Sequence, residues 1–591
     1  MVTASRHKRK DRPVGPAYKW IALSNTTLGV LMASIDSSIV LISLPAIFNG
    51  IKINPLAPGE TGYFLWLLLG YMVVTSTLLV TFGRISDMFG RVRLYNLGFL
   101  IFAIGSVLLW LTPSTGNTGA IELIVFRLIQ AIGSGFLFAN SAAILTDAFP
   151  AHQRGLAMGI NQIAAILGSV IGLILGGILS YFDWRLVFLV SVPVGIVGTI
   201  WAYMMLRETA TIREHQKLDW PGNITFAIGL TAILIGITEG IEPYGSSPMG
   251  WTSPLVLTAL IGGAAFLGIF VWIELHTSDP MFRLDLFKIR AFALGNTSSF
   301  LGSIARGGLQ FMLIIWLQGI WLPLHGYDYA VTPLWAGIYL LPLLGGFVVI
   351  GPISGWLSDR FGARVFSTAG MVIQVVGFLL LTVLPSNFEY IWFALIIFTL
   401  GFGQGMFSAP NTTSVMNSLP PDQRGVGSGM RATFQNAGSL ASIGIFFSIV
   451  IAGLAATLPN TLLTGLSKAG VPVPVAGAIA NLPPTSALFS AFLGYNPMGS
   501  LLPPQVLHSL PKANQLNLLG HSFFPHLISP PFMTGLHAAF YISALLCLLA
   551  AVASVFRGKR YINEQGRLQR IPDVETIESA IELPARAAGN D

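Results

Sequence analysis

The chain has 591 residues, of which 53% are hydrophobic and 10% charged, whereas a soluble protein carries about 25% charged residues. Its mean hydropathy is +0.71. These values exclude a water-soluble globular fold. The formal net charge of +7 would suit binding to nucleic acid or to acidic lipid. The positions of the basic residues along the chain have to show whether either partner is needed. A single cysteine, Cys547, excludes an intrachain disulfide and a cysteine-based metal site.

Fourteen apolar runs follow one another along the chain, each long enough to cross a bilayer as a helix. They are centred near residues 35, 72, 103, 133, 168, 195, 231, 264, 306, 341, 375, 401, 440 and 545. Glycine and proline inside such runs are tolerated in membrane helices. The sequence therefore predicts an all-α polytopic protein of a cell membrane, with the lipid bilayer as a partner.

The basic residues orient these helices. With the N-terminus inside, 25 of the 32 lysines and arginines lie in inner loops, four lie outside and three lie within spans. This is the distribution that the positive-inside rule requires. Both termini are expected in the cytoplasm, and the basic charge is explained without nucleic acid.

Two loop motifs occur twice, which indicates an internal repeat. GRISDMFGR at 83–91 returns as GWLSDRFGA at 355–363, an offset of 272, and the QRG at 153–155 returns at 423–425, an offset of 270. The predicted division is a basic N-terminus at 1–18, a six-helix bundle at 19–206, two inserted helices with their loops at 207–293, a second six-helix bundle at 294–556 and a cytoplasmic tail at 557–591.

The second bundle contains an outer segment at 458–533, which is apolar but holds 12 of the 35 prolines. Because proline breaks a helix interior, we expect short interfacial helices or a hairpin over the outer mouth. The tail is charged and has no sustained apolar period, so it is expected to be mostly disordered.

The repeated loop motif resembles the G-x-x-x-D-x-x-G-R signature of the major facilitator superfamily. Other segments resemble its fourteen-helix drug:proton antiporter branch (the QacA/EmrB type), over about residues 18–556. The resemblance implies a latch on the cytoplasmic side. Its residues are Gly83, Asp87, Gly90 and Arg91, echoed by Gly355, Asp359 and Gly362. Physically, Gly83 permits close helix packing, Gly90 a tight turn, and Asp87 can face a helix N-terminus. Ala363 replaces the second arginine.

The first apolar run contains ASIDSSIVLISLP, which places Asp36 inside the bilayer and resembles a signature of this branch. A carboxylate there is costly and usually functional. The fourth run contains RLIQAIGSG, which resembles a second signature through Arg127 and Gln130. Both charges belong to the outer half of the membrane and can pair. We expect Asp36 and Arg127 to form the proton-coupling site; the alternative is a permanent ion pair that holds two helices together.

The fifth run carries a face of small residues that resembles the antiporter signature of the family and permits a close helix crossing. It consists of Gly168, Gly172, Gly176 and Gly177. Leu173 stands where the family has proline, so the kink attributed to that proline is not expected.

Polar residues within the spans are candidates for a substrate cavity. They are Gln130, Asn161, Arg306, Gln310, Asn411, Arg431 and Gln435. Arg306 and Arg431 can contact an anionic substrate, although pairing with a carbonyl or snorkelling explains them equally well. Since Asp36 is the only deeply placed acid, neutral, monocationic or lipid-like substrates are favoured.

The resemblance implies a secondary transporter whose two bundles rock about a midplane cavity and export hydrophobic or amphipathic compounds in exchange for protons. Two alternatives stay open, namely an exporter of an endogenous lipid, antibiotic or siderophore, and a membrane scaffold or sensor that does not transport. No P-loop, H-E-x-x-H or G-x-S-x-G motif is present, which argues against an ATP-driven pump and an enzyme. We expect no cofactor and no metal, with the proton gradient as energy source. An adaptor protein is conceivable, but no coiled-coil docking segment indicates one.

Overall fold

The computed structural model describes residues 17–53, 60–150, 153–208, 219–245, 247–277, 280, 282–420, 423–492, 496–558, 561–564 and 567–570. Fourteen helices in these ranges are long and apolar enough to cross a membrane. Each of the fourteen apolar runs found in the sequence falls within one of them. The prediction of an all-α, multi-pass protein of the cell membrane is confirmed.

The N-terminal bundle is made of the first six spans. Its helices are α2 (Tyr18–Gly50), α3 (Thr61–Phe89), α4 (Arg91–Trp110), α5 (Gly116–Ala148), α6 (Arg154–Phe182), and α7 (Leu186–Leu189) with α8 (Ser191–Met205) as the sixth span. The most extensive helix packing in this bundle is between α2 and α6, and α5 packs against both α3 and α4. Small residues on α6 explain the close fit to α2, as described below.

The C-terminal bundle repeats this pattern. Its helices are α11 (Arg290–Arg306), α12 (Leu309–Ile315), the π-helical η3 (Trp316–Trp321) and α13 (Leu322–Leu324) as one span, α14 (Thr332–Tyr339) with α15 (Leu341–Phe361), α16 (Ala363–Leu381), α17 (Tyr390–Asn417), α18 (Arg424–Lys468) and α24 (Phe523–Val555). Here α11 packs against α18, and α17 packs against both α15 and α16. These three pairings correspond to the three of the first bundle, in the same helix order.

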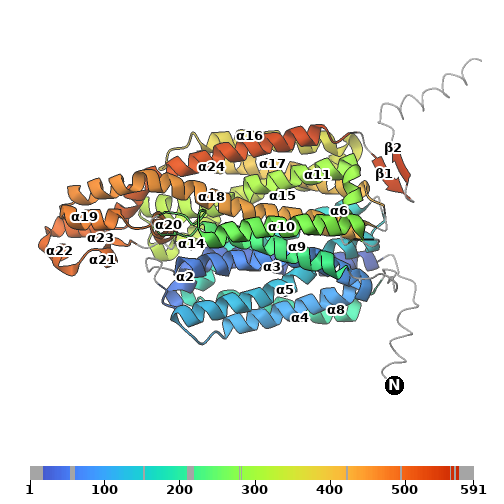
Figure 1. Cartoon of the computed structure of the whole chain (residues 1–591), viewed down its shortest axis with the longest axis horizontal. Coiled ribbons are helices and arrows are strands. Elements are labelled where there is room, and N and C mark those ends of the chain that lie inside the picture. The colour runs from blue at the N-terminus through green and yellow to red at the C-terminus, as the bar shows by residue number, and fades with distance from the viewer. Residues whose placement is uncertain are drawn as a thin grey trace, which may run out of the picture.

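Two further spans, α9 (Trp220–Gly240) and α10 (Pro254–His276), pack against each other. Helix α9 also contacts α3 of one bundle and α18 of the other. The pair therefore lies along the seam between the bundles, as Figure 1 shows. Short 3-10 turns η2 (Leu284–Lys288) and η4 (Tyr329–Val331) precede α11 and α14.

The outer segment folds into five short helices. They are α19 (Val473–Ala480), α20 (Pro484–Phe492), α21 (Met498–Leu501), α22 (Pro504–Ser509) and α23 (Lys512–Leu519). Most of them project beyond the bundles at one end of the molecule (Figure 1). The ends of the predicted 458–533 segment belong to two long helices, since α18 continues through Pro459 and α24 already contains Pro530 and Pro531. Membrane helices tolerate such prolines.

The described part of the tail contains two short strands. Strands β1 (Tyr561–Glu564) and β2 (Arg567–Arg570) form an antiparallel hairpin that pairs Tyr561 with Arg570 and Glu564 with Arg567. The stretches 1–16, 559–560, 565–566 and 571–591 lie outside the described residues, so the expectation that the tail is mostly disordered stays a prediction.

Candidate functional site

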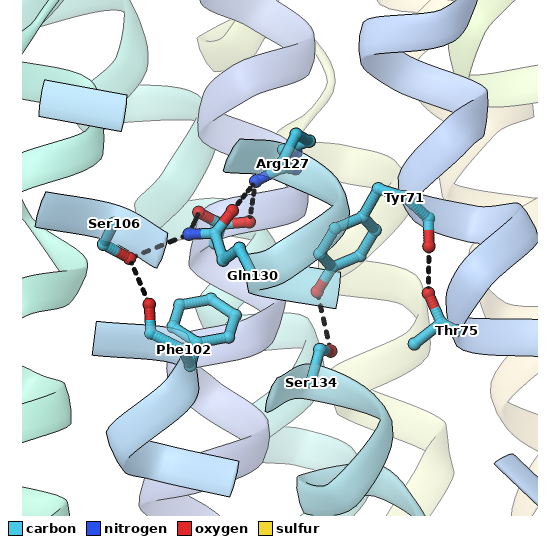
Figure 2. A network of polar contacts seen from close by, with 8 residues as sticks. Tyr71, Thr75, Phe102, Ser106, Arg127, Gln130 and Ser134 are labelled. Atoms are coloured by element: carbon cyan, nitrogen blue, oxygen red, sulfur yellow. Dashed lines mark hydrogen bonds and ion pairs between the residues drawn. The ribbon is translucent and has the colours of Figure 1, made fainter. Parts of the chain in front are cut away.

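Asp36 on α2 and Arg127 on α5 are in contact in the interior of the N-terminal bundle. The exposed fraction is 0% for Asp36 and 3% for Arg127. The guanidinium donates from Nη1 to Asp36 Oδ2 and to Gln130 Oε1. The amide of Gln130 donates from Nε2 to Asp36 Oδ1 at 2.8 Å and to Ser106 Oγ at 2.8 Å. Figure 2 shows Gln130 between Arg127 and Ser106.

A second layer of contacts extends this network toward α3. The Arg127 guanidinium lies 4.3 Å from the centre of the Tyr71 ring, and Tyr71 donates its hydroxyl hydrogen to Ser134 Oγ at 2.6 Å (Figure 2). Removing one partner of a buried ion pair costs about 3–5 kcal/mol, since the other charge is left without compensation. Asp36 is thus a buried acid whose charge is balanced by one arginine, an arrangement in which gain of a proton would release Arg127.

The motif that is expected to form a cytoplasmic latch contains a turn in each bundle. Gly90 has φ +105° between α3 and α4, and Gly362 has φ +88° between α15 and α16, a backbone region that favours glycine. Arg91 Nη1 forms an ion pair with Asp147 Oδ2 at 2.6 Å. The side chains of Asp87 and Asp359 lie outside what the structure describes.

Glu208, which sequence reasoning missed, closes the same turn. Its carboxylate accepts hydrogen bonds from the backbone nitrogens of Arg91 at 3.1 Å and Val92 at 3.0 Å. It therefore caps the N-terminus of α4. Burial raises the pKa of Glu208 above its usual value, against the lowering effect of the two backbone donors. No local signal marks this residue, since it follows the sixth span, more than a hundred positions from the turn.

Among the described atoms, a Cβ at Gly83 would meet nothing within 4 Å, and one at Gly355 would meet only Ala409 at 3.6 Å. The described contacts therefore do not support the expectation that Gly83 permits close packing. Within the motif, the requirement for glycine comes from the turn positions, because only there is φ positive.

The glycines of α6 do lie at close helix crossings. A Cβ at Gly168 or Gly172 would stand 2.6 or 2.5 Å from a backbone oxygen of α2, and one at Gly176 would collide with Ile42. Ser43 of α2 donates to the Gly176 carbonyl at 3.1 Å. These three residues explain why α2 and α6 form the tightest pair of the bundle.

Gly177 faces the other bundle. A Cβ there would stand 2.6 Å from Leu334 Cα on α14. Leu173, the residue in place of the family's proline, is fully buried and packs against Gly337 on the same helix. The bundles thus meet tightly at the outer end of α6.

Helix α20 closes the outer side further. The Phe489 ring lies 4.4 Å from Phe64 on α3 and 5.7 Å from Phe447 on α18, measured between ring centres. Phe489 is 1% exposed. One side chain of the outer segment therefore fills the space between the two bundles.

On the inner side the bundles separate around two cavities. The first, of about 250 Å³, lies between α5 and α6 of one bundle and α17 and α18 of the other, toward their cytoplasmic ends. The second, of about 340 Å³, lies deeper, mainly among helices of the C-terminal bundle. Gln435 lines both cavities, so they are neighbours.

Most of the candidate cavity residues line these spaces. Asn161 and Arg431 line the first cavity, and Arg306 and Gln310 line the second. Arg431 Nη1 donates to Gln435 Oε1 at 3.1 Å, and Arg306 Nη1 donates to Gln374 Oε1 at 3.0 Å. Both arginines thus have an amide oxygen as partner.

Two candidates lie elsewhere. Gln130 belongs to the Asp36 network and lines neither cavity. Asn411 is buried, donates to the Gly295 carbonyl at 3.3 Å and accepts from Arg557 Nη2. Burial lowers the pKa of Arg557 to about 10. Arg557 was missed because it looks like an ordinary basic residue after the last span.

No cluster of three or more histidine, cysteine, aspartate or glutamate residues that could hold a metal ion occurs in the part of the chain that the structure describes. The sequence matches the model of the major facilitator superfamily over residues 26–443. The chain belongs to the major facilitator superfamily. Its relatives place it in the drug-efflux branch, and a member of this superfamily is a transporter rather than an enzyme.

Among the relatives, riboflavin transporter RibZ of Clostridioides difficile is 33% identical over 73% of this chain and 88% of its own length. Multidrug resistance protein Stp of Mycobacterium tuberculosis is 28% identical over 77% of this chain and 79% of its own. The tetracenomycin C resistance and export protein of Streptomyces glaucescens is 24% identical over 94% of this chain and 96% of its own length.

Solved structures of the superfamily share the fold. A double tryptophan mutant of XylE superposes with a TM-score of 0.52 at 14% identity, covering 95% of this chain and 99% of that one. A bacterial homologue of the human lysosomal transporter Spinster gives a TM-score of 0.52 at 14% identity, covering 92% of this chain and 97% of that one.

Proposed function

We propose that this superfamily member exports hydrophobic or amphipathic compounds in exchange for protons, by alternating access. The observation that carries the proposal is Asp36, an acid with no exposed surface whose two oxygens bind Arg127 and Gln130. An intramembrane acid is costly and typically marks a proton path. A scaffold has no need for it.

The arrangement of the bundles supports alternating access. Phe489, Gly177 and Leu173 close the outer side, while cavities lie between the bundles on the inner side. In the proposed cycle, a proton reaching Asp36 from outside neutralises it and weakens its hold on Arg127. The bundles then change their relative tilt, and loss of the proton to the cytoplasm restores the ion pair. Substrate leaves in the opposite direction.

The relatives support the proposed substrate class. Several of them are described as multidrug resistance or drug export proteins, and the cavities combine apolar side chains with amides. Such walls fit amphipathic organic molecules of varied shape.

The test measures proton movement in liposomes that contain the purified protein. A panel of lipophilic cations, neutral drugs and organic anions is added, and the internal pH is followed. We expect substrate-driven proton flux in the wild type and none in Asp36→Asn. Asp183→Asn, an exposed acid on the outer side, is the matched control and should keep full flux.

Loss of folding has to be separated from loss of coupling. Asp36→Asn leaves Arg127 unpaired, so the double variant Asp36→Asn with Arg127→Gln is measured as well. If either variant folds and retains wild-type proton flux, Asp36 is not the coupling site. A folded wild type that moves protons with no compound of the panel would contradict antiport of this substrate class.

A second candidate is export of one dedicated metabolite. It is favoured by RibZ, which is named for a single compound and shares 33% identity with this chain. The two candidates differ in range: a multidrug exporter should respond to several unrelated compounds of the panel, whereas a dedicated exporter should respond to one chemical type.

A further inference from the structure

We infer that the inner cavities select amphipathic organic anions, whose carboxylate, phosphate or sulfonate group binds between Arg306 and Arg431. The inference deepens the proposed export function and rests on it. It opposes the expectation from sequence that neutral or cationic compounds are preferred.

The first reason is the charge of the cavities. Arg306 and Arg431 line them, and no aspartate or glutamate is among the described residues that do. Neither arginine forms an ion pair with a described carboxylate; their side-chain partners are Gln374 and Gln435. Amide oxygens satisfy hydrogen bonds but do not neutralise charge. The cavities are therefore positively charged.

The second reason is the contrast with Arg127. That arginine is neutralised by Asp36 within the protein and has no need of a ligand. A membrane-embedded cation without a counterion is unfavourable, so two of them in one pair of cavities need an explanation. A bound anion supplies the missing charge, and arginine donates paired hydrogen bonds that fit carboxylate and phosphate oxygens.

The third reason is the arrangement of donors. Gln435 lines both cavities and accepts a hydrogen bond from Arg431, while Arg306 lines the second cavity. Arg431 Nε is buried and has no hydrogen-bond partner among the described atoms. Each cavity therefore has one arginine, and Gln435 is the residue that the two cavities share.

The rest of the lining matches the remainder of such a molecule. Amides surround the charged end, namely Asn161, Gln162 and Asn436 in the first cavity and Gln310 and Gln404 in the second. Apolar walls come from Phe138 and Met158 in the first cavity and from Leu343 and Phe347 in the second. An organic cation would find no acid among the described lining residues and would be repelled by two like charges.

The test compares two dyes with the same xanthene ring system and opposite charge, fluorescein and tetramethylrhodamine methyl ester. Binding to the purified transporter in nanodiscs is measured by fluorescence anisotropy. We expect fluorescein to bind at least about tenfold more tightly, which corresponds to one charged hydrogen bond. Riboflavin 5′-phosphate against riboflavin is a second matched pair, which differs only in the anionic group.

Substitutions locate the effect. Arg306→Gln and Arg431→Gln should each weaken fluorescein binding about tenfold and leave the rhodamine ester unchanged or bound more tightly. Arg431→Lys keeps the charge and should recover part of the affinity. Arg364→Gln, an exposed arginine on α16, is the control and should change nothing.

A stability measurement covers the case in which a variant fails to fold. Without substrate, Arg431→Gln removes an uncompensated charge and should unfold at the same or a higher temperature than the wild type. A wild type stabilised by fluorescein and a variant that is not stabilised by it would support the same conclusion.

The results that overturn the inference are distinct from those that overturn antiport. Tighter binding of the cation, equal binding of both dyes, binding of none of the probes, or anion affinity unchanged in both arginine variants would each reject anion selection. If the cation drives proton flux that requires Asp36, export by antiport stands and anion selection fails. If anions bind through the two arginines without proton flux, anion selection stands and antiport fails.

Discussion

The two bundles share one architecture but differ in the side chains that contact their buried arginines. In the N-terminal bundle, Asp36 pairs with Arg127 in the interior and Arg91 pairs with Asp147 at the cytoplasmic end. In the C-terminal bundle, the corresponding partners are neutral amides. They are Gln374 for Arg306, Gln435 for Arg431 and Asn411 for Arg557. The buried Arg127 of the first bundle thus has an acid as its partner, whereas Arg306 and Arg431 of the second have amides.

The repeat offsets show where the cytoplasmic ion pair was replaced. The offset of 270 carries Asp147 to Asn417, and the offset of 272 carries Arg91 to Ala363. The charged pair of the first half therefore has neutral residues at the matching positions of the second. The difference in charge between the bundles indicates that duplicated bundles can take on different functions. We propose proton coupling in the first bundle and ligand binding in the second.

The largest expected effect tests whether the charges are balanced in one bundle only. Arg127→Gln leaves Asp36 buried and unpaired, so we expect the free energy of unfolding to fall by about 3–5 kcal/mol. Arg431→Gln removes a cation that has no acid partner, so we expect a loss of less than about 1 kcal/mol or a gain. Denaturation in detergent, followed by tryptophan fluorescence, measures both.

Similar losses of unfolding free energy in the two variants would contradict the difference between the bundles, because they would show that Arg431 is also neutralised within the protein. Arg364→Gln serves as the control for loss of an arginine from an exposed position.

A somewhat smaller effect is expected where the bundles meet on the outer side. Phe489→Ala removes the ring that contacts Phe64 and Phe447, which we expect to weaken the outer closure by up to about 3 kcal/mol. A cysteine introduced at Gln310, in a background in which Cys547 is replaced by serine, should then react faster with an impermeant maleimide added outside. The control is Leu516→Ala, which alters an exposed residue of α23. Equal labelling of all variants would show that α20 does not close the pathway.

The inserted helices offer a third, weaker effect that depends on pH. Burial, together with the nearby Glu239 carboxylate, raises the pKa of Glu242 to about 7. Since the folded state holds this proton more tightly than the unfolded state, Glu242 adds stability below pH 4.5 that is lost as the pH rises through about 7. The expected loss is about 1 kcal/mol or less, because the carboxyl group is partly exposed.

The check is the melting temperature between pH 5 and pH 8. Glu242→Gln should show a flatter profile than the wild type, and Glu389→Gln, an exposed acid on the outer side, should reproduce the wild-type profile. A Glu242→Gln profile that follows the wild type would assign the pH dependence to other groups.

Much of this fold could be predicted because a bilayer leaves few choices. Apolar length fixes the spans and basic loops fix their direction, so all fourteen helices were found. Asp36 and Arg127 could be paired from sequence because charges are rare inside spans and the direction of each helix gives the depth of its charge.

Other features could not be predicted because they join segments that are distant in sequence. Arg557 reaches Asn411 across 146 positions, and Phe489 meets Phe64 although a whole bundle separates them in the chain. Gly83 shows a different limit: a motif marks a turn but does not say which of its glycines faces a neighbouring helix. The amide partners of Arg306 and Arg431 depend on side-chain placement that no spacing encodes.

The smallest effect tests the comparison by restoring what the second bundle lacks. Ala363→Arg together with Asn417→Asp rebuilds at α16 and α17 the pair that Arg91 and Asp147 form in the first bundle. A partly exposed ion pair contributes about 0.2–1 kcal/mol, so we expect a double-mutant cycle to give a coupling free energy in that range, with the single variants near neutral. The natural pair, removed in a matching cycle, should give a similar value. A coupling free energy of zero at the rebuilt pair, with a clear value at the natural one, would mean that the two cytoplasmic turns differ in geometry as well as in charge, and that the division between the bundles goes beyond the replaced side chains.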